Sequence, residues 1–251
     1  MSGRTLTYFL SDAHLGAAYI ADPKAHEGAL VSFLQSIEPT ARTVYLLGDI
    51  LDYWFEYRTV VPRGYVRFFG QLARMADAGI RIVWFTGNHD IWLFDYLRDE
   101  IGIEIADPKG GGMKTDIDGV RFFLGHGDDL GRQPRGYRML RRTFRCRFLQ
   151  KLYSGIHPRW TLPFAHGWSS HSRKAAPPEP RLEGRARAAL EVACRELASS
   201  DPELRYIVIG HHHVAVDEPV TGACRLVILG DWIKHRTYAV FDGSDLSLRA
   251  Y

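Results

Sequence analysis

Short apolar runs rich in β-branched and aromatic residues alternate along the chain with segments whose apolar residues recur every three or four positions. The first pattern is typical of buried strands and the second of amphipathic helices, so their alternation indicates an α/β domain. The expected strands are 6–10, 43–47, 81–85, 206–209, 224–229, 237–241 and 246–250. The expected helices begin at Asp22-Pro23, run through 65–75 to end at Gly79, and run through 182–197.

The sequence also predicts a β-hairpin and an insertion into the domain. The dipeptide Asp118-Gly119 within MKTDIDGVRFFL predicts a hairpin turn between antiparallel strands. Residues 131–180, bounded by GRQPRG and APPEP, are the one compositional break in the chain. We therefore expect a single domain over residues 1–251 that carries an insertion at about 131–180.

Composition narrows the class of protein. The chain is 46% hydrophobic and 24% charged, as in globular proteins, and no run of 18 apolar residues predicts a membrane-spanning helix. The first residues are unlike a secretory signal, so we expect a cytoplasmic protein. Three widely spaced cysteines without a CxxC pair favour neither a disulfide framework nor a thiolate zinc site.

Charge is distributed unevenly. The net charge is +3, yet residues 131–178 contain eleven Lys or Arg and no Asp or Glu. The rest of the chain has 21 basic and 29 acidic residues, a net charge of about −8. The insertion is therefore expected to meet a ligand or surface that is negatively charged.

Polar side chains follow five of the expected strands. They are Asp12 and His14, Asp49, the run Asn88, His89 and Asp90, then His126, and finally His211 and His213. In open α/β sheets the ligand-binding crevice lies beyond the carboxyl ends of the strands, where all these groups can converge. Carboxylate, amide and imidazole donors without a thiolate suit Mn, Fe or Zn.

The number of candidate ligands indicates two ions. Seven of these residues, all except His89 and Asp90, are too many for one ion. Two ions roughly 3.5–4 Å apart that share a carboxylate would use all seven and form a clamp for in-line displacement at phosphorus.

Each residue also has a structural interpretation when taken alone. Asp12 or Asp49 would more often cap a helix, His126 could be a hydrogen-bonded core imidazole, and Asn88 could form a turn. Because five segments supply these residues in one order, the two-ion site is favoured. Three acidic residues, Asp52, Asp128 and Asp129, remain open between orienting ligands and lying in solvated turns, and His212 and His235 are not expected to be ligands.

The ordered series D-x-H, G-D, G-N-H-D, H-G and G-H-x-H resembles the calcineurin-like metallophosphoesterase family. This resemblance implies a four-layer sandwich of two mixed sheets flanked by helices. It implies Asp12, His14, Asp49 and His213 around one ion and Asp49, Asn88, His126 and His211 around the other, with Asp49 as the bridge. It further implies His89 as general acid or electrostatic stabiliser and Asp90 as the carboxylate that orients it. Two divalent cations, Mn²⁺ or alternatively Fe or Zn, would activate a water for attack on phosphorus without a covalent enzyme intermediate.

The first part of the insertion, RGYRMLRRTFRCRFLQKLY, predicts one amphipathic helix. Its apolar positions are Tyr137, Leu140, Phe144, Phe148 and Leu152, and its basic ones are Arg138, Arg141, Arg142 and Arg145. Guanidinium groups suit phosphate, and the same composition suits an interfacial helix on anionic lipid; a solvated basic face is the alternative. Since the helix directly follows FLGHGDDLG, it is expected to begin at the metal site and act as a lid. The following IHPRWTLPFAHGWSSHSRK favours an apolar pocket with a polar mouth.

The segments SDAHLG, GDILDYWFEYR, GNHDIWLFDYL, HGDDLG and IHPRW are similar to the branch of this family that contains the UDP-2,3-diacylglucosamine diphosphatases of lipid A biosynthesis. That resemblance implies hydrolysis of a nucleotide-sugar lipid to UMP and 2,3-diacylglucosamine 1-phosphate by a peripheral protein on the cytoplasmic face of the inner membrane. It implies no nucleic-acid or obligate protein partner. The expected substrate contacts are Asn88, Arg138, Arg141, His171 and Lys174.

Two other functions stay open from the sequence. The first is a metallophosphodiesterase that acts on nucleotides or nucleic acid through the basic insertion. The second is a non-catalytic scaffold with the same fold. Intact ligand positions speak against the scaffold, because such relatives usually have eroded ones.

Overall fold

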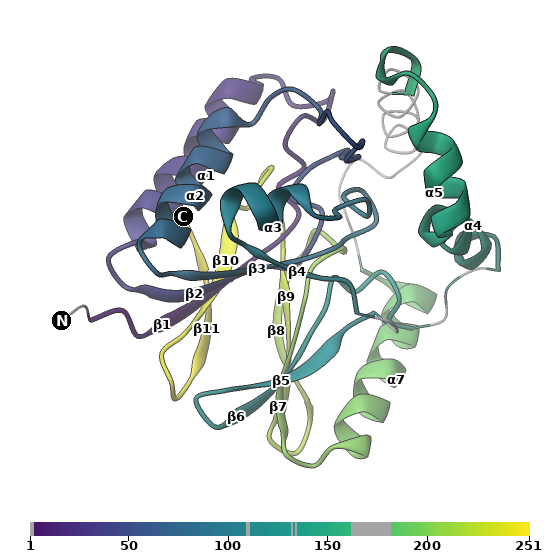
Figure 1. Ribbon diagram of the computed structural model, residues 1–251. Coiled ribbons are helices and arrows are strands. Elements are labelled where there is room, and N and C mark those ends of the chain that lie inside the picture. The colour runs from purple at the N-terminus through teal and green to yellow at the C-terminus, as the bar shows by residue number, and fades with distance from the viewer. Residues whose placement is uncertain (1–2, 109–110, 132, 134, 162–181) are drawn as a thin grey trace.

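Two mixed β-sheets pack face to face at the centre of the molecule, and helices cover their outer faces (Figure 1). The structure is a computed structural model that describes residues 3–108, 111–131, 133, 135–161 and 182–251. This arrangement confirms the expected four-layer sandwich of two mixed sheets flanked by helices.

The first sheet has six strands in the order β11-β10-β1-β2-β3-β4. Its parallel members are β1 Leu6–Leu10, β2 Ala41–Leu46, β3 Arg81–Phe85 and β4 Glu104–Ala106. Its antiparallel members are β10 Thr237–Phe241 and β11 Leu246–Ala250. The parallel strands β1, β2 and β3 all end at the same edge of the sheet.

The second sheet has five strands in the order β5-β6-β7-β9-β8. They are β5 Met113–Ile117, β6 Val120–Leu124, β7 Leu204–Ile209, β8 Ala215–Thr221 and β9 Cys224–Leu229. The three central strands β6, β7 and β9 are parallel, and the two edge strands are antiparallel to them. The turn between β5 and β6 has positive φ at Asp118 (52°) and Gly119 (79°), which confirms the predicted hairpin.

Helices lie on both outer faces of the sandwich (Figure 1). The six-stranded sheet packs against α1 Pro23–Ile37, α2 Val66–Asp77 and α3 Tyr96–Ile101, and the five-stranded sheet packs against α7 Gly184–Ser200. As predicted, α1 begins after Asp22, whose carboxylate accepts the N–H groups of Lys24 and Ala25.

The layer between the sheets is aromatic. Phe9 of β1 stacks on Phe122 of β6 with ring centroids 5.8 Å apart, and both side chains are fully buried. Because this packing fixes one sheet on the other, it also fixes the loops that leave their carboxyl ends.

The insertion contains two helices rather than the single one that its periodicity predicts. They are α4 Arg135–Arg145 and α5 Arg147–Ser154, separated by Cys146 in an extended conformation (φ −73°, ψ 110°). Phe144 packs on Trp92, but Phe148 and Leu152, which share its predicted face, are 69% and 57% exposed. The prediction was wrong because the chain bends at Cys146 and turns these two side chains away from the domain. In the part of the chain that the structure describes, no helix is long and apolar enough to cross a membrane.

Candidate metal centre

Loops at the carboxyl ends of β1, β2, β3, β6 and β7 converge on one site. Backbone hydrogen bonds tie these loops together, from the Asp12 N–H to the Gly48 carbonyl (3.1 Å) and from the His14 N–H to the Asp49 carbonyl (2.9 Å). A third runs from the Gly210 N–H to the His126 carbonyl (2.9 Å) and joins the two loops of the second sheet. The strand-end residues therefore meet because the loops themselves are hydrogen-bonded.

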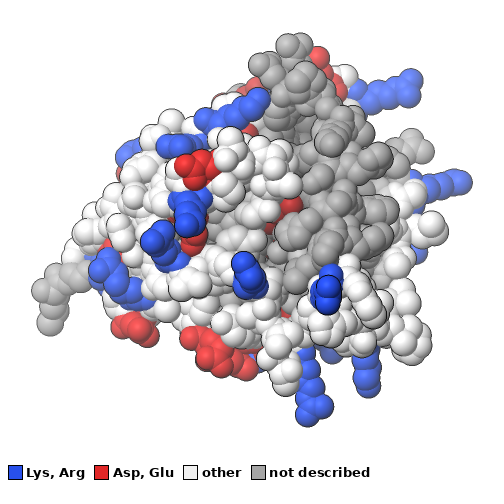
Figure 2. All heavy atoms as spheres, turned by 90° about the horizontal axis from the view of Figure 1, so that it is seen from above, with Lys and Arg blue, Asp and Glu red and all other residues white. Residues whose placement is uncertain are grey.

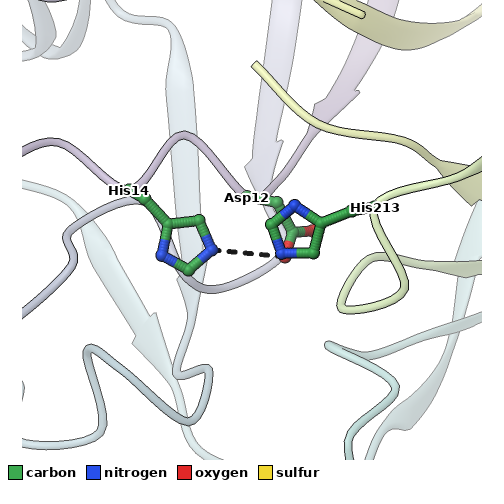
Figure 3. A group of neighbouring side chains, drawn as sticks. All are labelled: Asp12, His14 and His213. Atoms are coloured by element: carbon green, nitrogen blue, oxygen red, sulfur yellow. Dashed lines mark ion pairs between the residues drawn. The ribbon is translucent and has the colours of Figure 1, made fainter. Parts of the chain in front are cut away.

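Three groups of side chains at this site have donor atoms close enough to hold a metal ion. They are Asp12 with His14 and His213, then His14 with Asp49 and His89, and finally Asp49 with His126 and His211, each within 4.8 Å. Figure 3 shows the first group, in which Asp12 and His14 come from the loop after β1 and His213 from the loop after β7.

Asp49 lies between the two ends of the site. Its Oδ2 is 3.7 Å from His14 Nε2 and 3.3 Å from His126 Nε2. Asn88 Oδ1 lies 3.2 Å from the same His126 nitrogen. The structure thus brings together all seven residues expected as ligands, with Asp49 in the position expected of a bridge.

The buried carboxylate of Asp12 fits a cation. Its Oδ2 accepts the His211 N–H at 2.8 Å, whereas its Oδ1 is buried and accepts no hydrogen bond from the described residues. Oδ1 lies 3.5 Å from His213 Nε2. A buried carboxylate oxygen that accepts no hydrogen bond is costly, and a bound divalent ion would remove that cost.

Five of the candidate ligands have strained backbones. The φ angles of Asp12, His14, Asp49, His211 and His213 lie between 45° and 68°, the left-handed region that non-glycine residues seldom adopt. Such conformations cost about 1–3 kcal/mol each and cluster at functional sites. Their concentration here supports a functional role for the site.

Close packing of the loops requires glycine at Gly87. A Cβ on this residue would collide with the Asp49 carboxylate and lie 2.5 Å from the Asp49 backbone nitrogen. The glycine that precedes Asn88 therefore lets the loop after β3 approach the bridging position.

Burial and neighbouring charges set the protonation states. Burial, with repulsion from His126 and His212, lowers the pKa of His211 to about 3, so its imidazole is neutral, the form that binds a metal. Burial opposes ionisation of Asp12, but the neighbouring imidazoles of His14, His213 and His126 lower its pKa to about 2. Burial would lower the pKa of His126, but the charges of Asp49 and Asp12 raise it well above its usual value, so this imidazole would lose a proton on binding a metal.

His89 is held by Asp52. Its Nδ1 lies 2.9 Å from the Asp52 carbonyl oxygen and 3.4 Å from Asp52 Oδ1, and the same carboxylate oxygen is 3.3 Å from His14 Nδ1. Burial would lower the pKa of His89, but the charges of Asp49 and Asp52 raise it to about 9. Asp52 is itself buried, so it orients two histidines of the site and does not lie in a solvated turn.

Asp90 does not have the contacts expected of it. Its carboxylate accepts the backbone N–H groups of Asp49 (3.1 Å), Ile50 (2.9 Å), Leu51 (3.5 Å) and Gly87 (2.8 Å), and the indole N–H of Trp84 (3.1 Å). It therefore clamps the loop after β2 to the loop after β3. The expectation that Asp90 orients His89 is corrected: the structure gives that position to Asp52.

These contacts predict different effects for two conservative changes. Asp52→Asn should lower kcat by about 10- to 100-fold with little change in thermal stability, because it weakens the orientation of His89 and His14. Asp90→Asn should lower the melting temperature, because an amide cannot accept all five hydrogen bonds. Kinetics and thermal unfolding of both variants check this; equal kcat for Asp52→Asn and wild type would contradict it.

The other open acidic residues attach the insertion to the site. Asp128, directly after the His126 loop, lies 2.9 Å from Arg141 Nε and accepts the Tyr137 hydroxyl at 3.3 Å; Asp129 also pairs with Arg141. Arg141 is thus engaged by carboxylates, whereas Arg138 is exposed on α4. The expected contacts His171 and Lys174 lie outside the described residues.

Sequence reasoning missed one carboxylate. Asp231, which follows β9, is 2% exposed and its Oδ2 lies 3.8 Å from His213 Nδ1. The signal was present, because Gly230-Asp231 after β9 repeats the pattern of Gly48-Asp49 after β2. His212 and His235, not expected to be ligands, belong to none of the three candidate groups formed by the described residues.

The triplet at 211–213 predicts a contrast between neighbours. His211→Ala and His213→Ala should each abolish most turnover, because each removes a donor atom from a candidate group. His212→Ala should keep metal content and kcat close to wild type. Metal analysis and kinetics of the three variants test this, and a crippled His212→Ala would contradict it.

Comparison with known proteins agrees with this geometry. The model of the family called calcineurin-like phosphoesterase matches residues 6–215. A UDP-2,3-diacylglucosamine hydrolase of Porphyromonas gingivalis is 39% identical and the match covers 98% of both chains. A protein of the same name from Neisseria gonorrhoeae is 28% identical over 93% of this chain and 91% of its own.

Solved structures share the fold. A dimetal phosphatase from Danio rerio superposes with a TM-score of 0.50 at 15% identity, covering 98% of this chain and 95% of that chain. At this identity the likeness concerns the fold alone. The family match over most of the chain, together with the fold, leads to one conclusion: the protein belongs to the calcineurin-like phosphoesterase family.

Proposed function

We propose that the protein is a metal-dependent hydrolase that cleaves the pyrophosphate of UDP-2,3-diacylglucosamine to UMP and 2,3-diacylglucosamine 1-phosphate. The observation that carries this proposal is the match over 98% of both chains to a relative named for this substrate. The convergence of all seven expected ligand residues at one site supports it.

The residues of the site would divide the work as follows. Asp12, His14, Asp49 and His213 would hold one divalent cation, and Asp49, Asn88, His126 and His211 the other; we infer Mn²⁺, with Fe or Zn as alternatives. When bound, the cations would supply an activated water and neutralise charge on the phosphoryl oxygens. His89, kept protonated by Asp49 and Asp52, would stabilise the transition state or donate a proton to the leaving oxygen.

The insertion would hold the lipid part of the substrate. Its helix α4 is attached at Arg141 to the loop that carries His126, so it lies beside the site. Aromatic side chains line the contact between the domain and α5, with Trp92 stacked on Tyr153 and Tyr53 bonded to the same tyrosine (3.0 Å). We infer that Arg138 and Arg141 act near phosphate, and Asn88 on the substrate itself.

The insertion also supports peripheral association with the inner membrane. Met139, Phe148 and Trp160 are 69–70% exposed among basic side chains of residues 135–161. Figure 2, which views the molecule from above Figure 1, shows Lys and Arg side chains scattered over this face and projecting at its edges. We expect the wild-type protein to sediment with anionic phospholipid vesicles and Phe148→Ser to sediment with them less. Equal sedimentation of the variant and the wild type would contradict this role of the insertion.

Direct assay tests the proposed reaction. Wild-type protein with Mn²⁺ and UDP-2,3-diacylglucosamine in detergent should release UMP, and removal of metal by a chelator should stop the release. Release of product only from bis-p-nitrophenyl phosphate or from a nucleic acid, with steep salt dependence, would overturn the lipid substrate in favour of the phosphodiesterase alternative.

A further inference from the structure

The loop between β9 and β10 contributes a buried carboxylate that none of the proposed metal contacts uses. Asp231 is 2% exposed, and the backbone N–H of the next residue, Trp232, donates to the Asp12 carbonyl at 3.1 Å. This loop therefore lies against the loop after β1 that carries two candidate ligands. Burying a carboxylate is costly unless its oxygens accept hydrogen bonds or meet positive charge, so we consider the partners of each oxygen.

The two oxygens of Asp231 have separate partners. Oδ1 accepts the backbone N–H groups of Ile233 (2.8 Å), Lys234 (2.6 Å) and His235 (3.2 Å), which closes the turn. Oδ2 lies 2.9 Å from His235 Nδ1 and 3.8 Å from His213 Nδ1. One oxygen thus builds the loop, and the other faces the candidate ligand His213.

The two ring nitrogens of His213 likewise face different partners. Its Nε2 points into the candidate metal centre, 3.5 Å from Asp12 Oδ1, and its Nδ1 points to Asp231. The ring also stacks on His14, with centroids 5.1 Å apart (Figure 3). A neutral imidazole that donates from Nδ1 has its lone pair on Nε2, which is the nitrogen that a metal ion needs.

We propose that Asp231 is a positioning residue for His213: it keeps the proton on Nδ1 and holds Nε2 toward the metal ion. Carboxylates that accept from the distal nitrogen of a histidine ligand commonly fix its tautomer and raise metal affinity. The inference rests on the proposed metal-binding function of the site, and it adds a residue that lies outside the five segments with the expected ligands.

A purely structural role would confine Asp231 to closing the turn, and Asp231→Asn separates the two roles. The amide oxygen can still accept the three backbone N–H groups, whereas the amide NH₂ would face His213. Donation from this NH₂ to Nδ1 would move the ring proton to Nε2 and block the metal-facing nitrogen.

Mn²⁺ titration of the full-length protein by calorimetry tests the proposal without substrate. Asp231→Asn should lower the affinity for one of the two Mn²⁺ ions by about 10- to 100-fold and leave the affinity for the other unchanged. His235→Gln, the matched control, removes the other partner of Oδ2 and should leave both affinities as in wild type. On a His213→Ala background, Asp231→Asn should cause no further loss. Unchanged Mn²⁺ affinity of Asp231→Asn, or an equal loss in His235→Gln, would overturn the proposal.

The tautomer of His213 provides a second measurement that needs no metal. Correlation NMR of ¹⁵N-histidine-labelled, metal-free wild type should show the His213 proton on Nδ1, and Asp231→Asn should shift it to Nε2. If the variant does not fold, the wild-type spectrum decides alone: a proton on Nε2 would overturn the proposal. Because neither measurement uses substrate, a failure of the proposed lipid hydrolysis would leave both results interpretable.

Discussion

Replacing Asp49 with asparagine should reduce turnover of UDP-2,3-diacylglucosamine by about three orders of magnitude. Asp49 Oδ2 lies between His14 and His126, so its charge serves both candidate ion positions. A metal ion supplies several kcal/mol of transition-state stabilisation, and each 1.36 kcal/mol is a factor of ten in rate. Loss of about 4 kcal/mol therefore corresponds to roughly a thousandfold loss.

The asparagine variant keeps the local structure. Asp49 Oδ1 accepts the His89 N–H at 2.8 Å, and an amide oxygen can do the same. Kinetics and metal analysis should show fewer than two ions per chain and a folded protein by circular dichroism. Asp99→Ala, which removes an exposed carboxylate on α3, is the control and should be indistinguishable from wild type. Wild-type turnover by Asp49→Asn would contradict the bridging role.

His89→Asn is expected to lower kcat by about 10²- to 10⁴-fold, the usual range for loss of general acid help. His89 lies in one candidate metal group, yet its Nδ1 is occupied by Asp52. If it acts on the transition state and is not a metal ligand, the variant should keep two bound ions while kcat falls. Metal analysis beside steady-state kinetics separates the two roles.

Two results for His89→Asn would contradict a role in the transition state. Loss of one ion together with activity would make His89 a ligand, and retention of both ions with wild-type kcat would remove it from the reaction. His212→Ala is the matched control, because it changes a histidine of the loop after β7 that belongs to none of the candidate groups that the described residues form.

Residues at the ends of buried parallel strands could be predicted from the sequence. Strand periodicity locates the ends of β1, β2, β3 and β7, and parallel strands end at one edge of a sheet. That geometry brings the loops of Asp12 and Asp49 together at the first sheet, and the packing of the second sheet on the first adds His213 from the loop after β7.

Partners within the loops could not be predicted in this way. Asp90 is adjacent to His89 in sequence, but it turns inward to accept five hydrogen bonds, and Asp52 from another loop takes its expected position. The left-handed backbone of five candidate ligands is equally invisible to periodicity, because tertiary contacts impose it.

The remaining differences between the predicted and the observed elements arise where the local sequence pattern is weak. The edge strand β8 alternates partly buried and exposed residues and includes Pro219, so its sequence does not read as a buried run. The strand β4 has three residues, which are too few to form a periodic pattern. The helical periodicity of residues 135–154 continues across Cys146, but the backbone is extended there, and Phe144 and Tyr153 on either side of it both pack on Trp92.

Hydrolysis in ¹⁸O-labelled water tests the proposed reaction most directly. With Mn²⁺ and UDP-2,3-diacylglucosamine, wild-type protein should release UMP that contains one ¹⁸O atom, because we propose that water attacks the phosphorus on the uridine side. Asp49→Asn should release almost none under the same conditions. Label in the 2,3-diacylglucosamine 1-phosphate instead of UMP, or no UMP from the metal-loaded wild type, would contradict the account.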